Sequence, residues 1–380
     1  MDRTREHLPR DLIFYQILPK LPIKSLLRFT SACRTWLSTI KSPHFIAAHH
    51  HNLNLSENKV EYILIFDKHS CTILSNDAST KLAKIDFPFT LNFNRPPQSC
   101  NGLVLLSHRR TITDFNHDHT LWNPSLRKSK TLDAKIFAQR DVNVGTLWSS
   151  LFHHVFYGLG YHEPTKDHRV VRVRYTLNPS PPRDISDFPT EVDVYSVSTD
   201  SWHGVDSKPS LYIGLYYHIS VFVRGSLHWF GRQKVNEDGD YYKSLLLFDF
   251  GQECFREMEM PEHFHHLRYP KVAVLTEFEG TLAAFTAKAG VEWDENGTYL
   301  WVMTEYGVAE SWTRKLAFRV EVPWPWPTGC TQSAECEDHE KMHKILFGIG
   351  SGQSVKVFEG NRSYGNAVVV CKESFALLEA

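Results

Sequence analysis

Apolar residues near the start of the chain recur at steps of three and four, the spacing that places side chains on one face of an α-helix. Between residues 26 and 40 they are Leu26, Leu27, Phe29, Cys33, Trp36, Leu37 and Ile40. Leu-Pro steps end at Pro9 and Pro22, and proline favours the first turn of a helix. The pattern predicts three short helices, at roughly residues 10–18, 23–30 and 31–40.

These helices carry more apolar side chain than they can bury among themselves. About half of the residues between Leu8 and Ile46 are apolar or aromatic, yet so small a unit has too much surface for its volume to build more than a marginal core. A contiguous apolar surface is typical of a docking site. We therefore expect the helices to bind a partner; a helical cap on a β-domain is the alternative.

The pattern changes after residue 59. Short apolar runs rich in Val, Ile, Phe, Tyr and Trp are broken by Gly, Asn, Asp and Pro, which is typical of β-strands joined by turns. Examples are residues 61–66, 103–106, 192–195, 245–248 and 300–303. We expect an α+β multidomain chain, with a three-helix unit at 1–48, a linker at 49–59 and a large all-β domain at 60–380.

The β-region contains a weak internal repeat. A glycine opens an apolar strand at Gly102, Gly225 and Gly280, and a second strand with a large aromatic side chain follows each. This rhythm is typical of a β-propeller, whose blades are roughly forty to fifty residues long. The spacing predicts a propeller-like ring of about six or seven blades. A twisted β-sandwich or two stacked sheets is the alternative.

The N-terminal segment also resembles a known family. Residues 21–29 read Leu-Pro-Ile-Lys-Ser-Leu-Leu-Arg-Phe, and Cys33, Trp36 and Ser-Pro-His-Phe at 42–45 follow. This is similar to the plant form of the F-box, which implies docking onto a Skp-family adaptor and, through it, onto a cullin and a RING subunit. Helices laid in an apolar groove are a common mode of recognition. The residues expected near that interface are Leu8, Pro9, Ile17, Leu18, Leu21, Pro22, Leu26 and Leu27.

Within the helical unit, we expect Cys33 and Trp36 to tie the third helix to the others. The first helix departs from the F-box pattern, because the stretch at 12–18 is one residue longer than usual and Pro19 follows it directly. One helical residue is a rotation of roughly 100°. The register of the first helix therefore stays open.

A second resemblance covers most of the β-region. Characteristic phrases include Leu121-Trp122-Asn123-Pro124 and Gly225-Ser226-Leu227-His228-Trp229. Further matches lie at 99–104, 158–161, 167–172, 192–202, 247–261 and 301–313. They are similar, in family order, to the type 1 F-box-associated interaction domain of plants, a kelch-like or propeller-like domain. Its members include defence-linked receptors and S-locus F-box proteins that recognise secreted ribonucleases.

The net charge and the cysteine content indicate which kinds of partner and which cellular compartment to expect. The 380-residue chain has a net charge of −1, which gives no electrostatic case for binding nucleic acid. Its 7 cysteines are scattered without the spacing of a disulfide framework. The sequence shows neither a signal peptide nor an apolar run long enough to cross a membrane. We expect cytoplasmic or nuclear residence, with no contact with membranes.

Candidate chemistry is sparse. Cys330, Cys336, His339 and His343 offer two thiolates and two imidazoles, but a zinc finger with these ligands separates its cysteine and histidine pairs by about a dozen residues. The glycine-rich stretch at 348–352 precedes no helical pattern, so it predicts a tight turn and not a phosphate cradle. We expect no metal, no cofactor and no catalytic residue.

The two resemblances together imply the substrate-recognition subunit of an SCF-type ubiquitin ligase, which links the Skp-family adaptor to an unidentified target protein for ubiquitination and degradation. Such a subunit acts by holding the target near the conjugating enzyme. A scaffold that does not drive degradation, and an enzyme built on a propeller, are the alternatives. Loops that vary in length and composition are the expected target-binding surface. They lie at Phe137–Ser150, Asn178–Pro189, Asn236–Tyr242 and Trp324–His339.

Overall fold

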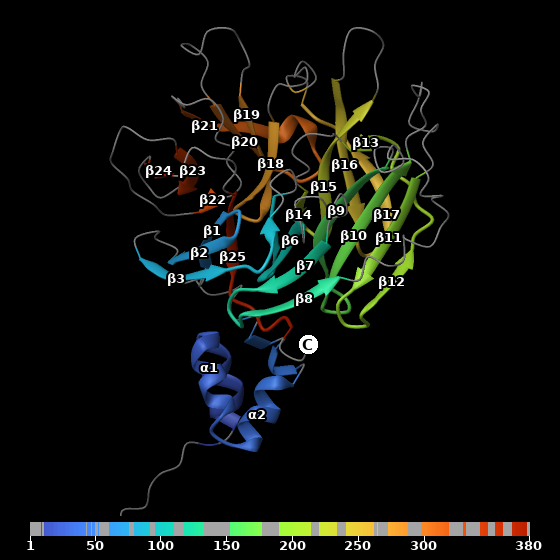
Figure 1. Cartoon of the computed structure of the whole chain (residues 1–380). Helices are drawn as coiled ribbons and strands as arrows, with labels where there is room; N and C mark the ends of the chain where they lie inside the picture. The colour runs from blue at the N-terminus through green and yellow to red at the C-terminus, as the bar shows by residue number, and fades with distance from the viewer. Residues whose placement is uncertain are drawn as a thin grey trace, which may run out of the picture.

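The structure is a computed structural model. It describes residues 9, 11–42, 44–46, 48–49, 52, 61–75, 80–91, 96–109, 118–132, 153–176, 190–213, 220–233, 241–261, 264, 273–287, 298–318, 330–331, 343–348, 354–359 and 367–377. Short helices at the N-terminus lie against one face of a β-propeller (Figure 1).

The helices begin with a π-helix at Leu12–Ile17 and a 3₁₀-helix at Leu18–Lys20. Two α-helices follow, α1 at Ile23–Thr30 and α2 at Arg34–Lys41. The backbone N–H of Leu18 bonds to the carbonyl of Ile13, a span of five residues where an α-helix has four. The π-helix therefore accommodates the extra residue of the first helix, and Pro19 lies in the 3₁₀ turn that ends it.

Within the described residues, twenty-two strands form five blades of four or five strands each. Blade 1 contains β1 (Glu61–Asp67), β2 (Ser70–Ser75), β3 (Lys81–Asp86) and, from the other end of the chain, β25 (Ala367–Lys372). Blade 2 contains β4 (Thr90–Leu91), β5 (Gln98–Cys100), β6 (Leu103–Arg109), β7 (Asp118–Asn123) and β8 (Lys128–Leu132). Blade 3 contains β9 (His153–His162), β10 (Asp167–Thr176), β11 (Thr190–Ser196) and β12 (Ser201–Gly204). Blade 4 contains β13 (Tyr212–Ile213), β14 (Val221–Val223), β15 (Ser226–Gln233), β16 (Tyr241–Asp249) and β17 (Cys254–Met258). Blade 5 contains β18 (Ala273–Phe278), β19 (Thr281–Ala287), β20 (Thr298–Met303) and β21 (Trp312–Phe318), with a 3₁₀ turn at Ala309–Ser311.

The expectation of about six or seven blades is corrected to five. In the described part of the chain the remaining sheet has three strands, β22 (Cys330–Thr331), β23 (His343–Gly348) and β24 (Ser354–Glu359), and β22 runs parallel to β23. The expected number came from dividing the β-region by one blade length. Stretches of unequal length, such as 133–152 and 319–329, separate the sheets, so that division overcounts.

Two kinds of tight turn repeat around the ring. The first hairpins of blades 2, 4 and 5 turn through Asn101-Gly102, Arg224-Gly225 and Glu279-Gly280, and both residues of each pair have positive φ. These are two-residue turns of type I′, in which glycine adopts the left-handed backbone without strain. The glycine repeat in the sequence thus marks the first hairpin of three blades.

The second hairpins of blades 2, 3 and 4, and the first hairpin of blade 3, have four-residue turns whose last residue has positive φ. These last residues are Arg127, Lys166, Asp200 and Glu253. Because alternate connections of an antiparallel sheet leave from opposite edges, these turns share one face of the ring with the type I′ turns. Leu126 in one of them packs against the N-terminal helices. We call this the helix-side face.

Apolar clusters fill the space between neighbouring blades. The largest joins blades 3 and 4 and includes Phe156, Tyr175 and Trp229. Gln98, on β5, ties three blades together near the axis, because its amide donates to the carbonyl of Tyr157 at 3.0 Å and accepts from the Ser220 hydroxyl at 2.7 Å. Contacts between neighbouring blades therefore hold the ring together.

His228, in the interior of blade 4, links this blade to blade 5. Its Nδ1 donates to the Val221 carbonyl at 3.2 Å, and its Nε2 accepts from the Tyr306 hydroxyl at 2.8 Å. Burial lowers the pKa of His228 from 6.5 to about 4. The neutral ring is therefore part of the native core.

Acidification is expected to weaken the propeller through His228. The unfolded chain takes up a proton on this ring near pH 6.5, whereas the native chain does so only near pH 4. The free energy of unfolding should therefore decrease as the pH is lowered from 6.5 to 4, and His228 accounts for about 3 kcal/mol of that decrease. Urea unfolding of the native chain and of His228→Gln at pH 7 and pH 4.5 measures it. The variant should lose less stability on acidification, and equal losses would contradict the assignment.

Candidate functional site

The N-terminal helices expose several large apolar side chains. In the described part of the chain, four large hydrophobic side chains are exposed, namely Tyr15 at 61%, Ile17 at 39%, Leu37 at 37% and Leu82 at 51%. The first three lie on the helices, and Leu82 lies on β3 at the outer edge of blade 1. Exposed apolar side chains gathered on so small a unit indicate a docking surface.

A small core holds the helices together from inside. Its buried members are Leu18, Ile23, Leu26, Ile40, Phe45 and, from the far end of the chain, Phe375. Trp36 packs edge-on against Phe14 and Phe29, with ring centroids 5.8 and 5.0 Å apart. Trp36, together with the buried Ile40, therefore packs α2 against the other helices.

The residues expected at the docking interface separate into three groups. Pro9, Ile17 and Pro22 are exposed, and Leu21 and Leu27 are partly buried. Leu18 and Leu26 are buried in the helix core, and Leu8 lies outside the described residues. Amphipathic spacing identifies apolar residues but does not show which of them the rest of the chain covers. The interface expected from the sequence therefore did not include Tyr15 and Leu37.

Cys33 does not tie the helices together. It is exposed, and it is the residue that precedes α2, with an extended backbone (φ −162°). The turn before α2 carries its side chain away from the core, so the contacts expected of Cys33 and Trp36 together come from Trp36.

The segment 373–377, which we call the C-terminal strap, lies between the helices and the ring (Figure 1). It follows β25 directly. Phe375 contributes to the helix core, and Leu377 contributes to the apolar cluster between blades 2 and 3. No local pattern in the sequence connects these residues with helices more than three hundred positions away.

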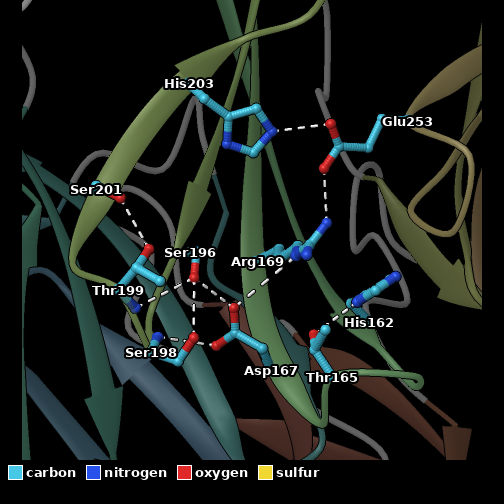
Figure 2. A network of polar contacts seen from close by, with 10 residues as sticks. All are labelled: His162, Thr165, Asp167, Arg169, Ser196, Ser198, Thr199, Ser201, His203 and Glu253. Atoms are coloured by element: carbon cyan, nitrogen blue, oxygen red, sulfur yellow. Dashed lines mark hydrogen bonds and ion pairs between the residues drawn. The ribbon is translucent and has the colours of Figure 1, made fainter.

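A polar network on the helix-side face joins blades 3 and 4 (Figure 2). Asp167 accepts hydrogen bonds from the Ser196 hydroxyl at 2.6 Å and the Ser198 N–H at 2.9 Å. Glu253, from blade 4, pairs with Arg169 at 2.6 Å and His203 at 2.8 Å, both from blade 3. These contacts hold adjacent turns in place.

The network does not have the arrangement of a nucleophile and its base. Ser196 donates to Asp167, and the Nε2 of His203 lies on the Glu253 carboxylate. A catalytic serine needs a histidine within hydrogen-bond reach of its hydroxyl. The hydrogen bonds of these described residues therefore indicate a structural role.

The described residues contain no group of three or more His, Cys, Asp or Glu side chains placed to hold a metal ion. Cys336 and His339 of the sequence cluster lie outside the described residues, as do the side chains of Cys330 and His343. None of the described helices is long and apolar enough to cross a membrane.

The four stretches expected to bind a target lie almost wholly outside the described residues. The strand ends that they connect can be placed, because β10 and β15 each run away from a turn on the helix-side face. Their connections to β11 and β16 therefore start at the opposite face. The strand ends that precede residues 178–189 and 236–242 therefore lie at the face opposite the helices.

Comparison with known proteins agrees with this architecture. The family model described as "F-box associated beta propeller domain" matches residues 54–367. The "F-box protein CPR1" of Arabidopsis thaliana is 26% identical over 329 residues, which cover 83% of this chain and 73% of that protein. The "Putative F-box protein At3g21120" of Arabidopsis thaliana is 25% identical over 367 residues, which cover 90% and 88%.

Likeness to solved structures is weaker. A "Hadza microbial sialidase Hz136" has a TM-score of 0.37 and 11% identity, over 66% of this chain and 54% of that chain. This value is too low to bear on function. The family match spans most of the chain, and both resemblances seen in the sequence are confirmed. The chain therefore belongs to the plant F-box proteins that carry an F-box-associated β-propeller domain.

Proposed function

We propose that this protein is the target-recognition subunit of an SCF-type ubiquitin ligase. The observation that carries the proposal is the exposure of three large apolar side chains, Tyr15, Ile17 and Leu37, on the helices of an F-box chain. The helices, residues 1–48, bind a Skp-family adaptor and through it the cullin and RING subunits. The propeller, residues 60–380 after a linker at 49–59, binds the target protein in the cytoplasm or nucleus.

The docking surface follows from the exposure of its side chains. Interfaces concentrate their binding energy in a few large anchors that fill apolar pockets. We assign this role to Tyr15, Ile17 and Leu37, and we include Pro9 and Pro22, which are exposed as well. We assign the partly buried Leu21 and Leu27 to the same interface, together with Leu8, which lies outside the described residues. Leu18 and Leu26 act from inside by holding the helices in shape.

The mechanism needs no catalytic group, metal or cofactor from this chain. A target held at one face of the ring, with the ligase assembled at the other, has its lysines at high effective concentration near the ubiquitin-charged enzyme. Two of the stretches that vary in length, 178–189 and 236–242, follow strands that end at the face opposite the helices, which suits them to bind the target.

A triple substitution tests the docking surface. Tyr15→Asp with Ile17→Asp and Leu37→Asp places three charges where apolar anchors are exposed, and should weaken binding of a purified Skp-family adaptor at least about a hundredfold. Leu82→Asp is the matched control, because this exposed leucine lies on the propeller. Calorimetric titration measures both. Equal affinity of the triple variant and the control would contradict the proposal.

Leu26 is unsuitable for this test, because a carboxylate at a fully buried position would disrupt the helix core. Loss of binding by a Leu26 variant would then report unfolding.

A capture experiment separates degradation from scaffolding. In plant extract with proteasome inhibitor, the native chain should bring down its partner in ubiquitin-linked form, since the ligase is assembled on its helices. The triple variant should bring down the same partner unmodified, because its propeller is unchanged. Immunoblotting for ubiquitin measures the difference. Equal modification in both captures would contradict the ligase role, and an unmodified partner in both would favour a scaffold.

A further inference from the structure

Helix α1 lacks a cap from its own neighbourhood. It begins at Ile23 directly after Pro22, no local side chain bonds to its first turn, and that turn contains no acidic residue. The first backbone N–H groups of a helix have no partner within it, and the N-terminus carries partial positive charge. An isolated α1 would leave these groups to water.

The missing acceptor comes from the other end of the chain. The Oε2 of Glu373 accepts a hydrogen bond from the Ile23 N–H at 2.9 Å, across 350 positions of sequence. The Glu373 side chain is buried. A carboxylate at a helix N-terminus stabilises the helix by both the hydrogen bond and the charge.

The same carboxylate is bound to the propeller. Its Oε1 accepts a hydrogen bond from the hydroxyl of Tyr62, on β1. Burial raises the pKa of Tyr62, so the phenol keeps its proton and remains a donor. Glu373 therefore joins α1 to blade 1 through two hydrogen bonds.

Phe375 joins the helix core to the ring by packing. Its ring contacts Phe45 and His49, with centroids 6.4 and 5.0 Å away. The Nε2 of His49 bonds in turn to the carbonyl of Leu21 at 3.0 Å. Without Phe375, the six-residue buried core of the helices would lose one of its two phenylalanines.

The rest of the strap is held by the propeller. The amide of Asn123 donates to the carbonyls of Ser374 and Ala376, at 2.8 and 2.7 Å. Gly102, at φ +82°, approaches so closely that a Cβ there would lie 2.1 Å from the Cβ of Ser374. Blade 2 therefore fixes the backbone of the strap while Phe375 reaches the helices.

We propose that residues 373–377 complete the fold of the F-box, so that its helices are fully formed and held in one orientation only when β25 has closed the ring. The F-box is then an extension of the propeller, tied to it by its own C-terminus. This inference concerns the chain alone. Its consequence, that the adaptor meets the target-binding face at a set angle, rests on the proposed function.

Hydrogen exchange of the full-length chain, followed by mass spectrometry, tests the strap. Phe375→Ala and Glu373→Ala should each raise exchange of the amides in α1 and α2 at least about tenfold, because the helices lose core and cap, while β15 and β16 in blade 4 keep their protection. Glu373→Gln keeps the shape but removes the charge, and should raise exchange in α1 less than Glu373→Ala does.

Val369→Ala is the matched control. Val369 lies on β25 within the cluster between blades 1 and 2 and is not part of the helix core. It should raise exchange in blade 1 more than in α1. Unchanged exchange of α1 in both Glu373 variants would overturn the proposal, even if Phe375→Ala fails to fold. Hydrogen exchange is measured without the adaptor. A failed docking test would therefore not affect this result, and a failed exchange test would not affect the docking result.

Discussion

The pairing of β25 with β1 is the interaction on which the rest of the structure depends. Residues 61–66 pair with 367–372 in an antiparallel ladder, which brings the two ends of the β-region together. Contacts so distant in sequence carry a large entropic cost of closing the chain. The ladder offsets that cost by completing blade 1 and by placing the strap against the helices. This one strand pairing therefore determines both the closure of the ring and the position of the helices on it.

The turns divide the ring into two faces with different physical properties. On the helix-side face, two-residue and four-residue turns join the strands of blades 2, 3 and 4, and residues such as Gly102 and Gly225 supply the left-handed backbone that the type I′ turns require. Short, bonded turns make this face a platform for the helices and the strap. β10 and β15 end at the opposite face, where a connection can change in length without disturbing the sheets.

The sequence predicts features that depend on neighbouring residues and fails where distant ones decide. α1 occupies the predicted range 23–30, because helical period and proline are local signals. The glycines at 102, 225 and 280 mark real hairpins for the same reason. Amphipathic spacing could not tell that Leu26 is buried and Leu37 exposed, since burial also depends on distant residues such as Phe375, which packs in the same core as Leu26. The number of blades likewise depends on which strands pair.

The apolar side chains of the N-terminal helices form two groups, one covered by the chain itself and one exposed, and the two groups depend on each other. One part is covered by Phe375 from the strap, and the other part, at Tyr15, Ile17 and Leu37, stays exposed. If all of its apolar surface faced a partner, a helical unit this small would have too few buried side chains to form a core of its own. The chain supplies the missing core from its own C-terminus. The exposed surface is therefore free to serve binding, and the same contact that shapes it also sets its orientation relative to the ring.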